Sequence, residues 1–157
     1  MKLIEALLEQ EKILVPRRSK EERAKNHLVV TQKKIQQYIK DGSKGDLNLS
    51  STPITSLPDN LKYVGGDLNL YSSTIKSLPN NLEVKGHLNL INTPITSLPN
   101  NLKVGKSLNL TSSEIKSLPD NLQVDGSLWI LNTPLEDKYS DEEIKNLAKI
   151  KGVIFRI

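Results

Sequence analysis

A segment that recurs about every 20 residues is the feature that most restricts how this chain can fold. Copies of it begin at Gly45, Gly66, Gly86, Lys106 and Gly126, at spacings of 21, 20, 20 and 20 residues. Each copy opens with two apolar residues at alternate positions, Leu-x-Leu in the first four copies and Leu-x-Ile in the fifth. This period is typical of a solenoid, in which each copy, here called a rung, adds a short strand and buries its apolar face only against its neighbours.

The Leu-Asn-Leu core of a rung predicts a strand with both leucines facing inward and the Asn facing outward, because strand side chains alternate between faces. A later proline cannot continue a helix and predicts an extended or tight-turn return on the opposite side of the stack. A hydroxyl three residues after the second apolar residue is expected to point inward and to satisfy buried backbone groups. These hydroxyl residues are Thr52, Ser73, Thr93, Ser113 and Thr133.

The segments on either side of the repeat are predicted to cap the stack, since a solenoid exposes its core at both ends. Apolar residues at helical spacing predict a helix over residues 2–13. A capping box formed by Ser19 and Glu22 predicts a second helix over about 19–40, and Ser140 opens a short third helix beyond the repeat.

The last residues are predicted to add a sixth rung whose return is helical. Val153, Phe155 and Ile157 alternate as they would in a strand. The expected fold class is an α/β solenoid with about five to six short parallel strands. Its expected parts are a basic helical cap over 1–44, a solenoid over 45–135 and a helix-strand cap over 136–157.

The composition excludes several kinds of site. The chain has no Cys, and therefore no disulfide, thiolate metal site or cysteine nucleophile. His27 and His87 lie in different elements without ligand spacing, and no Gly-rich phosphate loop is present. Stacking would make Asp46 and Asp67 neighbours, but two acids in line favour a structural role over cation binding. No apolar run approaches the roughly 18 residues of a membrane span, so we expect a soluble cytoplasmic protein without membrane partner. Because the site types above are lacking, we also expect no metal, cofactor or enzymatic activity.

The outward residues of the strands form a candidate protein-binding face, because a rigid sheet holds its side chains in fixed positions. Trp129 is the only tryptophan, and with three further apolar residues it makes the kind of exposed patch that anchors an interface. Alternatively, the C-terminal segment or a second copy of the chain covers this patch, and the Asn column hydrogen-bonds along the solenoid. The candidate residues on this face are Trp129, Tyr71, Ile91, Leu131, Asn89 and Asn109.

The basic residues are concentrated before the repeat. Residues 1–44 hold 11 Lys and Arg against 6 Asp and Glu, whereas residues 45–157 hold 11 against 12. Such a segment is able to contact the phosphates of a nucleic acid, and its simpler interpretation is a solvated helical face. The candidate phosphate ligands are Arg17, Arg18, Lys20, Arg23, Lys33 and Lys34.

The rung pattern L-x-L-x-x-[ST]-x-I-x-x-L-P-x-N-L resembles a leucine-rich repeat of the short, proline-containing kind, with Thr or Ser where such repeats usually carry Asn. Its length and its Leu-Pro-x-Asn-Leu turn are similar to repeats of bacterial effector proteins. The added basic N-terminal helix is similar to that of proteins of tailed phages and bacteria. Some effectors carry a ubiquitin-ligase domain with a Cys nucleophile, which this chain lacks. The strand face predicts a non-enzymatic protein-protein interaction module, and the resemblance implies that it binds a host factor in a bacterial or phage-infected cytoplasm. Nucleic-acid binding through the basic residues and self-association through the patch are the alternatives.

Overall fold

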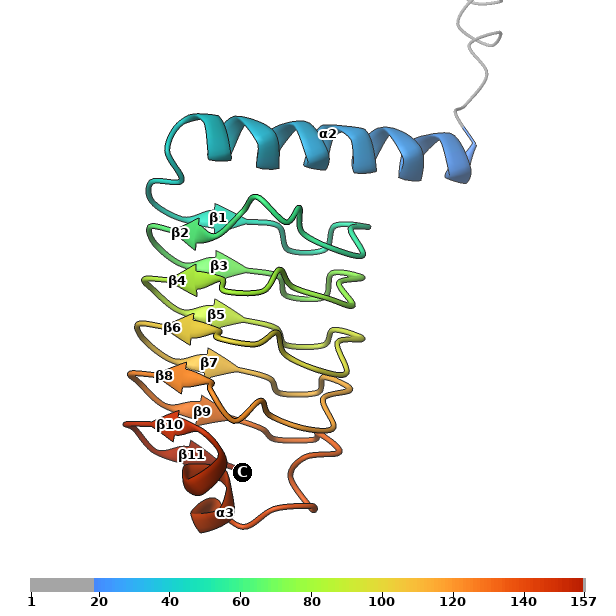
Figure 1. The fold of residues 1–157 in the computed structure, drawn as a ribbon. Helices are drawn as coiled ribbons and strands as arrows, with labels where there is room; N and C mark the ends of the chain where they lie inside the picture. Colours follow the sequence, from blue (N-terminus) through green and yellow to red (C-terminus); the bar gives the residue numbers. More distant parts are fainter. Residues whose placement is uncertain (1–18, 157) are drawn as a thin grey trace, which may run out of the picture.

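The computed structural model describes residues 19–156, and within them the chain forms a parallel β-solenoid with a helix at each end (Figure 1). Helix α2 (Lys20–Lys40) lies across the first rung, and helix α3 (Asp141–Leu147) lies at the opposite end. The helix predicted over residues 2–13, and the last position of the predicted final strand, Ile157, lie outside the described residues.

Two parallel sheets run along the stack. The first sheet holds six strands in the order β1 (Leu47–Asn48), β3 (Leu68–Asn69), β5 (Leu88–Asn89), β7 (Leu108–Asn109), β9 (Leu128–Trp129) and β11 (Ile154–Phe155). The second sheet holds five strands in the order β2 (Tyr63–Val64), β4 (Glu83–Val84), β6 (Lys103–Val104), β8 (Gln123–Val124) and β10 (Lys149–Ile150).

Corresponding residues of successive rungs pair directly, as Leu47 does with Leu68 and Val64 with Val84. The predicted stack of short parallel strands, including its sixth member, is therefore confirmed. The return side of each rung was expected only to be extended or turned, and the structure shows that it forms a sheet of its own.

The core is aliphatic and continuous along the stack, because the two apolar residues that open each of the five rungs face inward, as does the Val of β2, β4, β6 and β8. The hydroxyl residues beside this core are buried, as predicted. Thr52, Thr93 and Thr133 each donate to the carbonyl three residues earlier, at 2.6–2.7 Å. The hydroxyls of Ser73 and Ser113 have no hydrogen-bond partner within the described part of the chain, so the predicted backbone contact is made only in the Thr rungs.

Thr and Ser rungs also differ in the residue that follows. Each of these Thr residues precedes a proline, which has no amide hydrogen. After Ser73 and Ser113 the next residues do have one: the amide of Thr74 donates to the Thr52 carbonyl at 3.2 Å, and that of Glu114 to the Thr93 carbonyl at 3.3 Å. Two rungs together therefore form the complete structural repeat.

The residue immediately before each of the first five strands of the first sheet connects its rung to the next by a hydrogen bond. These residues are Asp46, Asp67, His87, Ser107 and Ser127. The amide of Asp67 donates to Oδ1 of Asp46 at 2.7 Å, and the amide of His87 donates to Oδ1 of Asp67 at the same distance. The ladder continues when the Ser107 amide donates to Nδ1 of His87 at 3.2 Å and the Ser127 amide to Oγ of Ser107 at 3.1 Å. The structural role expected for the two carboxylates is confirmed, since both accept backbone hydrogen bonds.

Glycine allows this ladder to pass close to the preceding rung where rungs begin at Gly66 and Gly86. A Cβ placed on Gly66 would lie 2.1 Å from Oδ1 of Asp46, and one on Gly86 would lie 2.0 Å from Oδ1 of Asp67. Real Cβ atoms do not approach an oxygen so closely, which explains why most rungs begin with glycine.

Helix α2 caps the first rung, as the sequence predicts. The capping box of Ser19 and Glu22 is formed, and Ile35 is buried against the core. The hydroxyl of Tyr38 lies 2.9 Å from the Ser43 carbonyl and also accepts a hydrogen bond from the Gly65 amide at 3.2 Å. Burial raises the pKa of this phenol above its ordinary value of 10.0, because the charged form would lose its hydration.

The far end closes with an arginine in place of a core leucine. Because β11 pairs with β9 at Ile154 and Phe155, Arg156 follows opposite Ile130, where other rungs carry an inward Leu or Ile. Its Nε contacts Asp141 at 2.6 Å, and its other nitrogens donate to the carbonyls of Glu136 and Tyr139. This guanidinium ends the apolar column and holds the loop before α3 under the stack.

The final strand and helix differ from the sequence prediction in detail. Ile154 is 6% exposed and faces the core, whereas Val153 is 58% exposed. The sequence predicts that the helix opening at Ser140 also carries Ile150. The helix is formed with its capping box, but it ends at Leu147, and Ile150 belongs to β10.

Candidate functional site

The outward face of the first sheet carries the predicted protein-binding residues in two columns. Trp129 stands in the column of the asparagines, opposite Asn109 of the preceding rung. Tyr71, Ile91 and Leu131 follow two residues after the outward position of their strands and form the next column. Tyr71 is 45% exposed, and the other three side chains are half-buried.

Apolar side chains gather at the C-terminal end of this face. The rings of Trp129 and Phe155 stack with centroids 3.9 Å apart and an interplanar angle of 15°. Val153 lies immediately before β11 and is largely exposed, and Leu131 follows Trp129 on the same face. We call these four residues, Trp129, Leu131, Val153 and Phe155, the terminal patch.

The structure therefore relocates the centre of the predicted surface. Tyr71 and Ile91 lie in successive rungs, and Thr111 separates them from Leu131, so the four predicted anchors do not form one cluster. Sequence reasoning did not assign Val153 and Phe155 to this surface. Aligning the last strand on Ile154 instead of Val153 would have placed Phe155 beside Trp129.

The asparagines of the face have a structural role within their own rungs. Oδ1 of Asn89 accepts from the Ile91 amide, and Oδ1 of Asn109 accepts from the Thr111 amide, each at 3.0 Å. These bonds fix the bend that ends each strand, and each uses one of the two acceptor lone pairs of its Asn side chain. The Asn column of this face therefore does not hydrogen-bond along the solenoid through its Oδ1 atoms.

An asparagine ladder is formed at a different corner of the rungs. Nδ2 of Asn101 donates to Oδ1 of Asn81 at 2.8 Å, and Nδ2 of Asn121 donates to Oδ1 of Asn101 at 2.6 Å. These residues belong to the Pro-x-Asn-Leu turns. Their regular spacing was visible in the sequence, but which Asn column would bond along the stack was not.

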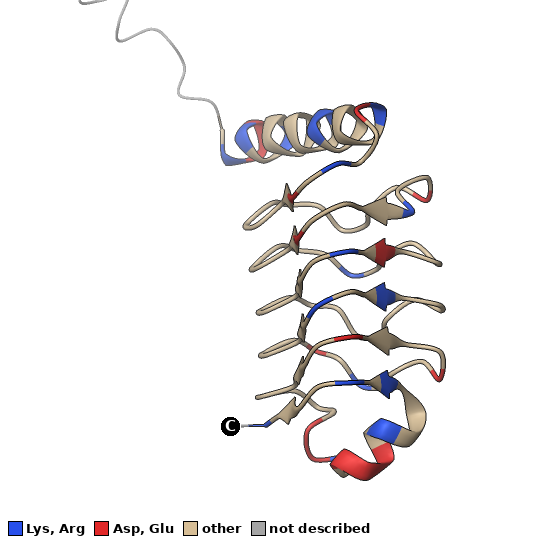
Figure 2. Cartoon of the chain, turned by 90° about the vertical axis from the view of Figure 1, so that its left-hand side faces the viewer, with Lys and Arg blue, Asp and Glu red and all other residues tan. Residues whose placement is uncertain are grey.

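The predicted phosphate ligands are spread along α2. Lys20 and Arg23 lie in its first turn together with Glu21 and Glu22, and Figure 2 shows these basic and acidic segments alternating. Lys33 lies ten residues beyond Arg23, which is about 15 Å along the helix axis. The structure therefore does not bring these residues together in one cluster.

The remaining predicted phosphate ligands divide into two groups. Nζ of Lys34 donates to the carbonyl of Asn48 at 2.5 Å and so helps to cap the first strand. Arg17 and Arg18 lie outside the described residues.

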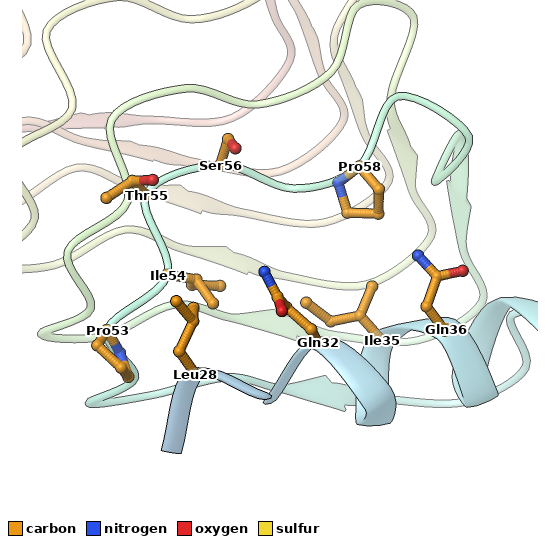
Figure 3. Close-up of a pocket in the computed structure, with 9 residues that line it drawn as sticks. All are labelled: Leu28, Gln32, Ile35, Gln36, Pro53, Ile54, Thr55, Ser56 and Pro58. Atoms are coloured by element: carbon orange, nitrogen blue, oxygen red, sulfur yellow. The ribbon is translucent and has the colours of Figure 1, made fainter. Parts of the chain in front are cut away.

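A groove that the sequence did not predict separates α2 from the return of the first rung (Figure 3). Its volume is about 480 Å³, and it arises where the first rung has no preceding rung to cover it. The walls are Leu28, Ile35, Pro53, Ile54 and Pro58, with amides and hydroxyls of Gln32, Gln36, Thr55 and Ser56 at the rim. None of the described residues that line this groove has an ionisable side chain.

Within the described residues, no group of three or more His, Cys, Asp or Glu side chains could hold a metal ion. None of the described helices is long and apolar enough to cross a membrane. Comparison with protein-family models, with curated proteins and with solved structures finds no significant match.

Proposed function

We propose that this chain is a non-enzymatic protein-interaction module that binds its partner through the outward face of the first sheet. The observation that carries the proposal is the stacked Trp129–Phe155 pair, which leaves a tryptophan half-exposed on a rigid surface. Tryptophan is prominent among the residues that dominate binding energy, and stacking holds its ring in one orientation before a partner arrives.

The face is suited to binding because each side chain on it is held by the repeat. In-register pairing fixes the strand spacing, and the ladder from Asp46 to Ser127 joins each rung to the next. The titratable groups of that column accept backbone hydrogen bonds, which supports a structural role for them instead of a catalytic one. A surface held in this way loses little conformational entropy on association.

The resemblance to short leucine-rich repeats belongs to this proposal. It is supported by the inward leucines and the in-register strands of the first sheet. By the same resemblance, we place the module in a bacterial or phage-infected cytoplasm, bound to a host factor.

The proposal is tested by affinity capture from a bacterial lysate at low and high salt, with nuclease treatment in parallel. The full chain is compared with Trp129→Ala and with Tyr63→Ala, a matched control because Tyr63 is an aromatic residue on the second sheet that is 37% exposed. We expect one discrete protein to be retained at high salt by the wild type and by Tyr63→Ala, and to be lost with Trp129→Ala. Circular dichroism establishes that both variants are folded.

Two results would contradict the proposal. Capture that is equal for all three proteins would show that the patch does not contact the partner. Retention of nucleic acid alone, released by salt, would favour the basic residues of α2 as the functional surface.

A further inference from the structure

The first sheet ends differently at its two ends. At β1 the edge is covered by α2, and Lys34 donates to the carbonyl of Asn48, on the side of β1 away from β3. At the other end β11 is the last strand and pairs only with β9 among the described strands. An unpaired strand edge presents backbone donors and acceptors that can bond to a further strand.

The backbone groups at this edge are identified by the hydrogen bonds on the other side of β11. The amides of Leu128 and Ile130 donate to the carbonyls of Val153 and Phe155. Alternate residues of a strand direct their backbone groups to opposite sides, so the amide and carbonyl of Ile154 point away from β9. The side chain of Arg156 turns inward to the Glu136 and Tyr139 carbonyls and does not cover this edge.

The nearby helix leaves the edge of the first sheet open. In Figure 2 the C-terminus and β11 lie at the lower left, whereas α3 lies at the lower right beneath the second sheet. Residue contacts agree with this view, because α3 packs against β10. The free side of β11 therefore faces neither α3 nor another of the described strands.

The chain beside this edge is acidic. Residues 136–143 hold five carboxylates and one lysine. Arg156 connects this segment to β11 by its contact with Asp141 at 2.6 Å. The edge thus has the apolar terminal patch on its outward side and, beyond the Arg156 guanidinium, the acidic segment on its inner side.

We propose that the partner adds an extended peptide strand to the free edge of β11, with apolar side chains over Val153 and Phe155 and alternating basic side chains toward residues 136–143. The inference rests on the proposed function and specifies its partner. Main-chain hydrogen bonds to Ile154 supply affinity, and the alternation of side chains supplies specificity. The period of two in a strand places the apolar and basic residues on opposite faces.

The test uses fluorescein-labelled peptides and the full chain. The probe is Lys-Val-Lys-Val-Lys-Val-Lys, its acidic twin replaces each Lys by Glu, and a third peptide carries N-methyl groups on alternate residues of the basic sequence. Fluorescence anisotropy measures affinity, and emission of Trp129, the only tryptophan, reports binding of the unlabelled peptide near the patch. We expect the basic probe to bind at least tenfold more tightly than either control peptide and to change the Trp129 emission.

A charge-reversal pair locates the site. Asp137→Lys with Glu142→Lys should weaken binding of the basic probe about tenfold and strengthen that of the acidic twin. Asp59→Lys with Asp120→Lys is the matched control, because it changes the net charge equally at exposed turns of other rungs. We expect the control pair to leave both affinities within about twofold of the wild type.

Several outcomes would overturn the inference. Equal binding of the N-methylated peptide would exclude strand addition, and equal effects of the two charge-reversal pairs would show attraction by net charge alone. A homodimer, detected by light scattering and dissociated by the basic probe, would assign the edge to a second copy. Loss of probe binding together with persistent Trp129-dependent capture would refute the added strand and leave the proposed function standing.

Discussion

Replacing Gly86 by Ala tests the close packing between rungs most directly. The added Cβ would lie 2.0 Å from Oδ1 of Asp67, 2.7 Å from the carbonyl carbon of Gly66 and 2.8 Å from the amide nitrogen of Asp67. Rotation of the Asp67 side chain relieves only the first of these contacts, since the other two involve backbone atoms. The rungs must therefore separate locally, and the hydrogen bond from the His87 amide to Asp67 is lost.

The expected cost follows from these two effects. An exposed backbone hydrogen bond to a carboxylate contributes about 1 kcal/mol, and the strain of overpacking adds roughly 1–3 kcal/mol. Alanine also restricts the unfolded chain, which offsets about 0.5 kcal/mol of the loss. We expect the free energy of unfolding to fall by about 1.5–3.5 kcal/mol, measured by urea denaturation followed by circular dichroism.

Lys106→Ala is the matched control, because Lys106 occupies the corresponding place in the next rung and already carries a Cβ. Its free energy of unfolding should stay within about 0.5 kcal/mol of the wild type. An unchanged or increased stability of Gly86→Ala would refute the argument that the ladder requires glycine here.

Three further predictions concern a turn, a titrating group and the patch. Ser112 has a φ of 55°, which Asn tolerates better, so Ser112→Asn should raise the free energy of unfolding by roughly 0.5 kcal/mol in a urea titration. A loss of stability would contradict this account of the turn. Because the pKa of Tyr38 is raised, its contribution is complete below pH 10.0, the ordinary value, and declines as pH rises through the folded-state pKa. Urea midpoints should fall more steeply above that pH for the wild type than for Tyr38→Phe, and parallel curves would contradict the role of the phenol. Phe155→Ala should shift Trp129 emission to longer wavelength and increase its quenching by acrylamide, whereas an unchanged spectrum would contradict the stacked pair.

The elements that the sequence predicted well are those determined by residues close together in the chain. Alternation of Leu and Asn sets the inward face of each strand, and the capping boxes at Ser19 and Ser140 set the starts of α2 and α3. The period near 20 residues then requires the strands to stack in register, because a slip of one residue would expose every leucine. For these features, local chemistry and the repeat permit only one arrangement.

The candidate site was predicted less completely because its members meet across the stack. Trp129 was recognised as a candidate anchor, but its contact with Phe155 joins residues 26 positions apart in the chain. The last strand has apolar residues on both faces, so alternation alone does not decide whether Val153 or Ile154 turns inward. Burial of Ile154 in line with Leu128 decides it, and this places Phe155 on the outward face.

By itself the sequence determined the solenoid, its core and the positions of its caps, since these follow from periodicity and from contacts within a few residues. Only the tertiary structure decided which polar column forms the ladder, where the terminal patch lies and which sheet edge remains open. Those features depend on the separation and direction of groups about 20 residues apart. Successive rungs fix that geometry only when all of them are assembled.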